Sequence, residues 1–306
     1  MPNYARALPI DTVRADELTE QEFYRNYVAK NRPCHIVGAA THWPGYTDWT
    51  SVDKLKAATR NAPVPVNTAP VLEFPPTKIG SQEELDKRAA AAPVQMPFHE
   101  FLDQASSRSA HLVARVPALV PGGIFSGLLR DIGKFRFLQN PRKTMGYAPL
   151  RAFFYRQSYT DWHCHPADET LMTQVVGAKE VLLLPPDDQS WDALYPVVCQ
   201  KGYLYDVDLE AFPAVGKLRP LRAVVGAGDA LYIPVYWWHA VASADDSCGV
   251  TVAACFGTPP HVAGDLRHPF ARKIFKDLLT SRLAPLALII VCYAYLYRAL
   301  APLRGR

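Results

Sequence analysis

The stretch that decides the fold is Gly228-Asp-Ala-Leu-Tyr-Ile-Pro-Val-Tyr-Trp-Trp-His239. Residues 229–233 alternate as a short strand does, and Pro234 ends that strand because proline cannot donate a ladder hydrogen bond. The aromatic turn that follows delivers His239 to the start of another strand, residues 240–243. We therefore expect one imidazole at the mouth of a β-structure, where it is either a packed core histidine or a metal ligand.

A second stretch, Asp161-Trp-His-Cys-His-Pro-Ala-Asp-Glu169, carries two histidines spaced two residues apart. Side chains at that spacing point to the same face of a strand. If both converge with His239, three imidazoles and a nearby carboxylate form a ligand set for iron, manganese or zinc in an open or octahedral site. The candidate ligands are His163, His165, Glu169 and His239, with Asp168 as the alternative carboxylate.

From His111 onward the sequence is rich in short strands separated by Gly, Pro and Asp turns. Their spacing favours a two-sheet antiparallel sandwich or jelly roll, because the long helices that connect parallel strands are mostly missing. We predict a mainly β fold with flanking helices, divided into a mixed α/β region at 1–109, a jelly-roll metal-binding core at 110–258 and C-terminal helices at 259–306. The predicted strands are 111–116, 150–156, 170–176, 179–184, 221–225, 229–233, 240–243 and 249–256.

The region before His111 is predicted to be mixed. Residues 19–30 begin with acidic side chains and carry an apolar stripe, which indicates a helix that Asn31-Arg-Pro ends. Further predicted elements are a strand at 34–39 and helices at 52–59 and 96–103. Residues 60–95 are rich in proline and charge, so we expect irregular structure there, with a helix start at Ser81.

Composition limits the class of protein. The 306 residues are 49% apolar and 11% aromatic, which is ample for a packed core. The net charge of +4 is small and the basic residues are scattered along the sequence, so no nucleic-acid partner is expected. The six cysteines include no C-x-x-C pair, and the N-terminus has no apolar run of signal-peptide length. A reducing, cytoplasmic location fits best.

The C-terminal segment has two alternative interpretations. Residues 269–282 are basic and amphipathic, and an uncharged apolar run follows at 283–297. Extended to 283–303 and including Arg298, the run reaches the roughly 20 residues that a membrane-spanning helix needs. It is therefore either a possible transmembrane anchor or a helix packed on the body or against a second copy in a homodimer.

The two histidine stretches together resemble a known superfamily. The first resembles the cupin pattern H-x-H-x3-4-E, and Gly228-x5-Pro234-x4-His239 fits the second cupin motif except at Tyr236, where glycine is usual. The sequence is most similar to the JmjC or cupin-8 branch of Fe(II)- and 2-oxoglutarate-dependent dioxygenases, and in motif to the asparaginyl hydroxylase that inhibits the hypoxia-inducible factor. Further matching segments within residues 32–257 are Arg32-Pro-Cys-His-Ile-Val-Gly-Ala, Trp43-Pro, Gln174-Val-Val-Gly-Ala-Lys179 and Leu184-Pro-Pro.

The resemblance implies a double-stranded β-helix that binds Fe(II), uses 2-oxoglutarate as cosubstrate and hydroxylates a protein or small-molecule substrate. In this resemblance, Lys179 aligns with the family lysine that forms an ion pair with the distal carboxylate of 2-oxoglutarate. Thr160 aligns with a family residue whose hydroxyl points at the same carboxylate. Lys179, Val181 and Leu183 share one strand face, and a lysine inside an apolar barrel requires an anion to neutralise it. The alternative is an outward lysine at a strand edge.

Two departures from the family pattern bear on activity. His165 stands where the second ligand is usually an acid, so the carboxylate is Glu169, Asp168 or absent. Cys255 stands where the asparaginyl hydroxylase has an asparagine that helps to bind the cosubstrate. The alternatives to an oxygenase are therefore a degenerate, non-catalytic metal-binding cupin and a cupin-type metal enzyme that does not use 2-oxoglutarate.

Overall fold

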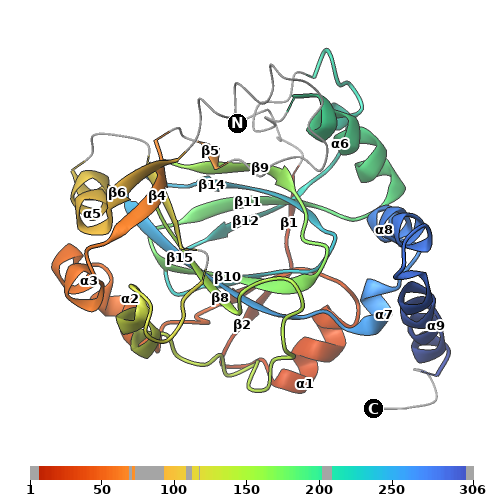
Figure 1. Ribbon diagram of the computed structural model, residues 1–306, viewed down its shortest axis with the longest axis horizontal. Coiled ribbons are helices and arrows are strands. Elements are labelled where there is room, and N and C mark those ends of the chain that lie inside the picture. The colour runs from red at the N-terminus through yellow and green to blue at the C-terminus, as the bar shows by residue number, and fades with distance from the viewer. Residues whose placement is uncertain are drawn as a thin grey trace.

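Two β-sheets lie face to face, with helices around them (Figure 1). The computed structural model describes residues 7–68, 71–72, 93–107, 112–116, 118–201 and 209–300. The six-stranded sheet has the order β1 (Leu8–Pro9), β12 (Leu221–Val225), β11 (Lys179–Leu184), β14 (Trp238–Ser243), β9 (Tyr159–His163) and β5 (Val71–Leu72). The nine-stranded sheet has the order β2 (Thr12–Arg14), β3 (Cys34–Val37), β13 (Ala230–Ile233), β10 (Asp168–Val176), β15 (Cys248–Gly257), β8 (Leu150–Arg156), β7 (Leu112–Val116), β4 (Pro63–Asn67) and β6 (Val94–Pro97). The prediction of a mainly β jelly roll is confirmed.

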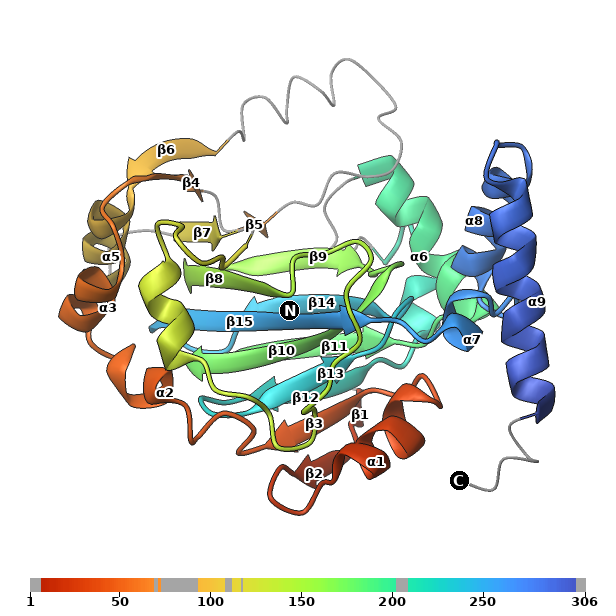
Figure 2. The same ribbon diagram turned by 60° about the horizontal axis from the view of Figure 1, so that its bottom comes forward.

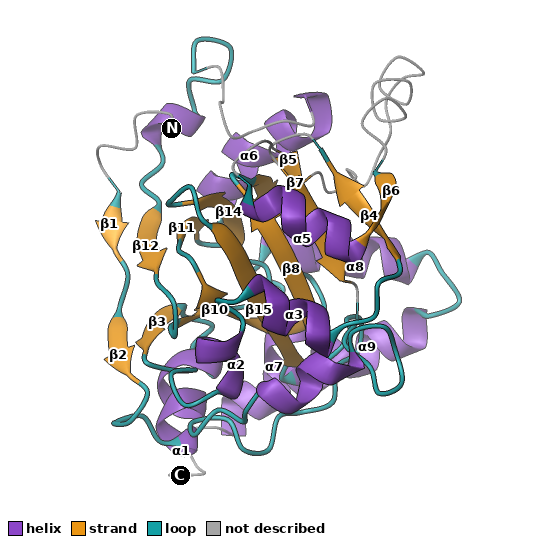
Figure 3. Ribbon diagram, turned by 90° about the vertical axis from the view of Figure 1, so that its left-hand side faces the viewer, coloured by secondary structure: helices purple, strands orange, loops and turns teal. Residues whose placement is uncertain are grey.

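The helices cover different parts of the two sheets. Three helices lie at the end of the molecule that faces the viewer in Figure 3: α2 (Pro44–Asp48), α3 (Val52–Ala58) and α5 (Phe98–Ser106). Near the opposite end lie α6 (Asp188–Lys201), α7 (Pro260–Ala263), α8 (Pro269–Leu279) and α9 (Ala284–Leu300), as Figure 2 shows. The remaining helical segments are α1 (Glu20–Phe23), which a π-helical turn follows (Tyr24–Val28), and two 3₁₀ turns (Ser126–Asp131 and Val215–Lys217).

Three layers of apolar side chains hold the sheets and helices together. Between the sheets, Met172, Val181, Leu183, Val225, Leu231, Ile233 and Val241 form one buried cluster. Outside the nine-stranded sheet, the aromatic ring of Phe23 packs edge-on against Tyr232, with ring centroids 5.1 Å apart. Outside the six-stranded sheet, Leu194 of α6 packs with Leu182 and Trp238. Every long strand is therefore buried on at least one face, which fixes its register.

The strand register sets the position of the histidines. β14 pairs antiparallel with both β9 and β11, and His239 is paired with His163 on one side and with Leu183 on the other. In the opposite sheet, β10 and β15 pair Thr170 with Cys255. The ends of β9, β14 and β10 therefore meet at one mouth of the double sheet.

Several local predictions differ from the structure. β4 falls in the proline-rich region that is predicted to be irregular. It forms because Val64 and Val66 alternate into the core while Pro63 and Pro65 point outward. The helix expected at 19–30 is a short α1 followed by the π-helical turn. The helix expected from Met96 begins two residues later, after β6. The helix start expected at Ser81 lies outside the described residues.

The expectation of a transmembrane helix is wrong. α9 has 17 residues, about 25 Å at 1.5 Å per residue, against roughly 30 Å of bilayer hydrocarbon. Among the described residues, no helix is both long and apolar enough to cross a membrane. The homodimer alternative stays a prediction.

Polar and close contacts hold α9 on the body of the protein. The guanidinium of Arg298 donates to the carbonyl of His261 at 3.2 Å and forms an ion pair with the buried Asp265. Gly264 allows the two segments to approach, because a Cβ at that position would lie 2.8 Å from the carbonyl oxygen of Ile290. α9 is therefore anchored to the segment that follows β15.

We predict that Arg298→Met loosens α9. Removing a charged partner from a buried carboxylate typically lowers local stability by about 1.4 kcal/mol or more, so amide hydrogen exchange in α9 should accelerate by about tenfold or more. The control is Lys273→Met, because Lys273 contacts Asp277 only at 3.7 Å and both side chains are partly exposed. Equal exchange rates in Arg298→Met and the parent would show that the ion pair does not hold the helix.

Candidate metal centre and adjoining cavity

Three histidines meet at the mouth of the double sheet. His163 is the last residue of β9, His239 lies in β14 directly opposite it, and His165 follows two residues after β9 ends. One ring nitrogen from each lies within 4.8 Å of the other two. The ring centroids of His163 and His239 are 4.0 Å apart, and those of His165 and His239 are 4.7 Å apart. The sequence prediction that these three residues converge is confirmed by this geometry.

Hydrogen bonds orient two of the three rings. Nδ1 of His239 lies 3.0 Å from the carbonyl of Trp237, so this nitrogen donates and Nε2 is left as the ligand atom. Nδ1 of His165 lies 3.0 Å from the hydroxyl of Thr170, and the N–H of Tyr236 donates to the His165 carbonyl at 2.8 Å. Burial lowers the pKa of His239 to about 4, so its imidazole is neutral at pH 7, as a metal ligand must be.

The structure does not bring the two predicted carboxylates into the histidine cluster. Glu169 lies on the face of β10 opposite to Thr170, where it accepts hydrogen bonds from the Tyr232 hydroxyl at 2.8 Å and the Val235 N–H at 3.1 Å. Burial raises the pKa of Glu169 to about 8. Asp168 accepts hydrogen bonds from the N–H groups of three consecutive loop residues, Met145, Gly146 and Tyr147, at 2.7–2.8 Å. Both acids are used to fix neighbouring backbone.

The donor set fits a borderline divalent metal. Three imidazoles suit iron, manganese or zinc and leave further coordination positions open. Within the described part of the chain, these histidines form the group of side chains able to hold such an ion. Among the described residues, the cluster differs from a two-histidine, one-carboxylate triad in that it contains no carboxylate.

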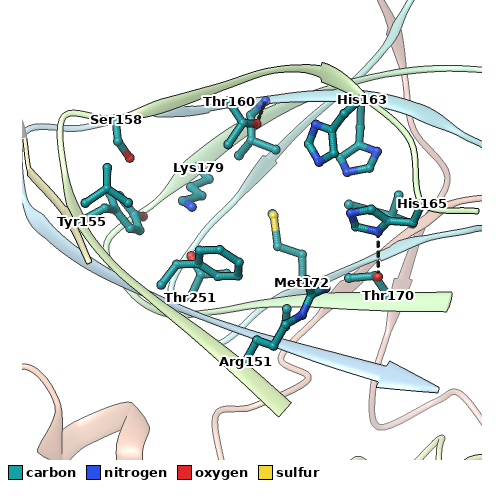
Figure 4. Close-up of a pocket in the computed structure, with 16 residues that line it drawn as sticks. Arg151, Tyr155, Ser158, Thr160, His163, His165, Thr170, Met172, Lys179 and Thr251 are labelled. Carbon is teal, nitrogen blue, oxygen red and sulfur yellow. Dashed lines mark hydrogen bonds between the residues drawn. The ribbon is translucent and has the colours of Figure 1, made fainter. Parts of the chain in front are cut away.

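A cavity of about 70 Å³ adjoins the histidines (Figure 4). It is lined by side chains from both sheets: Val113, Arg151, Phe153, Tyr155, Ser158, Thr160, His163, His165, Thr170, Met172, Lys179, Ile233, His239, Val241, Thr251 and Ala253. Thr160 lines it, and its hydroxyl accepts a hydrogen bond from the Val241 N–H at 3.2 Å, so the O–H can still donate. Its role toward a carboxylate stays a prediction. The described lining contains two cationic side chains and no carboxylate.

Lys179 points into this cavity, as the strand pattern predicted. It is 8% exposed, and its ammonium lies 4.1 Å from the ring centroid of Tyr155 and 6.0 Å from that of Phe153. Among the described residues no carboxylate forms an ion pair with it. Burial lowers the pKa of Lys179 to about 7. The cation–π contacts compensate part of the desolvation of the charge, and an anion in the cavity would compensate more.

Arg151 is a cavity residue that the sequence reasoning missed. It is 5% exposed, its guanidinium lies 4.5 Å from the ring centroid of Tyr147, and its Nη2 lies 3.2 Å from Cys255 Sγ. The available signal was the period of β8: Arg151, Phe153 and Tyr155 are two residues apart and therefore share a face.

The sequence is similar to known proteins over most of its length. Residues 20–256 match the model of the family described as cupin-like domain. The lysine-specific demethylase JMJ30 of Arabidopsis thaliana is 26% identical over 250 residues, 76% of this chain and 52% of that protein. The human bifunctional peptidase and (3S)-lysyl hydroxylase JMJD7 is 24% identical over 73% of this chain and 77% of that protein. The Jumonji C domain-containing protein 5 of Drosophila melanogaster is 23% identical over 79% of this chain and 59% of that protein.

The chain spans little more than half the length of two of these relatives. The similarity to an asparaginyl hydroxylase stays a prediction from motifs.

We predict that His239→Ala removes most of the bound metal, because two imidazoles form an incomplete ligand shell. Protein reconstituted with Mn(II) should retain about one equivalent in the parent and in Glu169→Gln, whose side chain lies on the other face of β10. His261→Ala, at a histidine outside the cluster, is the matched control for loss of an imidazole. Elemental analysis measures the metal content of each variant. Loss of metal in Glu169→Gln would show that this carboxylate is a metal ligand after all.

Proposed function

Because the family model covers residues 20–256, this chain belongs to the cupin-like domain family, and we propose that it is an Fe(II)- and 2-oxoglutarate-dependent oxygenase that hydroxylates a protein or small-molecule substrate. The observation that carries the proposal is one cavity that joins the three-histidine cluster to a buried lysine with no described carboxylate partner. The relatives named as a lysyl hydroxylase and a demethylase support it.

The cavity suits a short dicarboxylate with a metal-binding group at one end. Lys179 would bind the distal carboxylate of 2-oxoglutarate, and the O–H of Thr160 would donate to the same group. The apolar walls, which include Phe153, Met172 and Val241, exclude water and so strengthen this ion pair. A bound carboxylate would return Lys179 to its charged form.

His163, His165 and His239 would hold the iron. When bound, Fe(II) supplies the redox chemistry that couples decarboxylation of 2-oxoglutarate to hydroxylation of a C–H bond. The hydrogen bonds of His165 to Thr170 and of His239 to the Trp237 carbonyl keep Nε2 of each ring directed at the site. The contribution of the protein is therefore orientation, imidazole ligands and a largely apolar cavity.

A second function is favoured by the absence of a carboxylate from the described histidine cluster. A ligand set of three imidazoles leaves the metal one unit more positive than a set with an acid, which disfavours loss of electrons to oxygen. The chain could therefore be a non-catalytic member that keeps the metal and the anion site. A cupin-type metal enzyme that does not use 2-oxoglutarate has the same ligands.

The direct test is succinate formation from 2-oxoglutarate with Fe(II) and ascorbate, because uncoupled turnover requires no known substrate. We expect activity in the parent, a loss of roughly 100-fold or more in His239→Ala, and no change in Lys217→Met, an exposed lysine that serves as control. His165→Asp separates the alternatives. An inert parent with an active His165→Asp variant would indicate the non-catalytic member, and inactivity of both would exclude the oxygenase.

We also predict that 2-oxoglutarate affinity depends on pH through Lys179. Its pKa of about 7 in the empty cavity means that it is charged at pH 6 and mostly neutral at pH 8. Binding a carboxylate favours the charged form, so binding should take up about 0.9 proton at pH 8 and little at pH 6. The affinity should fall by up to about tenfold per pH unit above 7. Calorimetry of the Mn(II)-loaded protein in buffers of different ionisation enthalpy measures both quantities.

Lys179→Met is the matched variant for this measurement. It should lower the affinity by roughly 10- to 100-fold and remove the proton uptake. The ligand-free variant should melt roughly 2–4 °C higher, because a buried charge with no described acidic partner is replaced by an apolar side chain of similar size. Affinity that stays constant from pH 6 to 9 in the parent would contradict the assignment of Lys179.

A further inference from the structure

We propose that Arg151 is the second anion-binding residue of this cavity and holds the carboxylate of 2-oxoglutarate next to the keto group, at the metal end. This inference rests on the proposed function. The two carboxylates of the cosubstrate are then recognised by two different cations, Arg151 near the histidines and Lys179 away from them.

The first argument is that Arg151 lacks sufficient partners. It lies on β8, paired with Ala253 of β15, and both residues line the cavity. One of its donors reaches only the thiol sulfur of Cys255, a weak acceptor, and its buried Nε has no hydrogen-bond partner. An arginine keeps its charge in proteins, so this guanidinium cannot avoid the cost of burial by losing a proton. An anion in the cavity would supply the missing acceptors.

The second argument places this anion at the metal end. A series of contacts leads from Arg151 to a proposed metal ligand: Nη2 lies 3.2 Å from Cys255 Sγ, that sulfur lies 3.8 Å from Thr170 Oγ1, and this hydroxyl lies 3.0 Å from Nδ1 of His165.

Lys179 belongs to a different group of contacts. Its ammonium lies over the ring of Tyr155, whose hydroxyl accepts a hydrogen bond from Gln174 at 2.6 Å. Figure 4 shows Lys179 and Arg151 entering the cavity from different strands, with Arg151 near Met172 and Thr170. The two cations therefore serve different parts of the cavity.

The third argument concerns charge and shape. No carboxylate belongs to the described histidine cluster, so none there competes for the guanidinium. A planar guanidinium can give a carboxylate two parallel hydrogen bonds, which fixes the plane of the bound group as a lysine cannot. Arg151 would thus orient the keto-acid end of the cosubstrate, and a metal would then bind a group whose orientation the protein has already set.

The test uses two ligands and two substitutions on Mn(II)-loaded protein, with affinities measured by calorimetry. The ligands are 2-oxoglutarate and 2-oxopentanoate, which has the same chain length and keto-acid end but no distal carboxylate. Arg151→Gln should weaken both ligands by a similar factor, roughly 10- to 100-fold. Lys179→Met should weaken 2-oxoglutarate alone and so reduce the preference for it over 2-oxopentanoate. Arg222→Gln, at an arginine whose side chain is 54% exposed, is the control.

The result that overturns the inference is unchanged affinity for 2-oxopentanoate in Arg151→Gln. That outcome, with 2-oxoglutarate binding intact, would assign the guanidinium to another ligand, such as an anionic substrate. If the parent binds neither ligand, the proposed function itself fails. Binding of 2-oxoglutarate that is weakened by Lys179→Met but not by Arg151→Gln removes the role of Arg151 alone.

A fold control accompanies the measurement. Arg151→Gln should bind Mn(II) as the parent does, since the arginine is not among the proposed ligands. If Arg151→Gln does not fold, Arg151→Lys replaces it: a point charge without the planar fork should still weaken both ligands together. Unchanged affinities for both ligands in that variant would again overturn the inference.

Discussion

The site depends on the register between β9 and β14. Because side chains alternate along a strand, a shift of one residue would turn His239 away from His163 and toward the outer face. The same strand fixes Lys179, since β14 also pairs with β11, where Ser243 is the partner of Lys179 and His239 that of Leu183. A single central strand therefore aligns the metal end and the lysine end of the cavity, and the apolar cluster between the sheets keeps that register in place.

The cavity combines two buried cationic side chains with three imidazoles. Such an arrangement is costly when empty, because desolvation of Lys179 and Arg151 is offset only by aromatic rings and weak acceptors. Sites that bind charged ligands commonly sacrifice stability in this way, and the ligand restores the missing interactions. The position of Glu169 differs: its Oε2 accepts hydrogen bonds from Tyr232 and Val235 on the other face of β10, and the side chain does not line the cavity.

The sequence predicts most accurately those strands in which apolar residues alternate clearly and which turn residues bound on both sides. Leu150–Arg156, Lys179–Leu184 and Leu221–Val225 have the predicted bounds. His163 and His239 converge because β9 and β14 pair in register, whereas His165 lies past the end of β9 and is held by the Tyr236 N–H and the Thr170 hydroxyl. The orientation of Asp168 and Glu169 could not be predicted, because it depends on the residue at which β10 starts and on which loop supplies donors. Arg151 was missed for a similar reason: the strand was recognised, but nothing local shows which of its faces turns inward.

The turn between β13 and β14 links parts of the chain that are far apart in sequence. Tyr236 adopts a left-handed backbone conformation, with φ of +66°, which disfavours residues other than glycine. Its N–H holds the His165 carbonyl, its hydroxyl donates to Ala263, and the indole of Trp237 donates to the Asn31 carbonyl at 2.8 Å. The contacts of this strained turn couple the ordering of His165 thermodynamically to an N-terminal segment at Asn31 and a C-terminal segment at Ala263. Binding of a metal at the three-histidine cluster should therefore also stabilise these N-terminal and C-terminal segments. The segments and the cluster should then resist unfolding together.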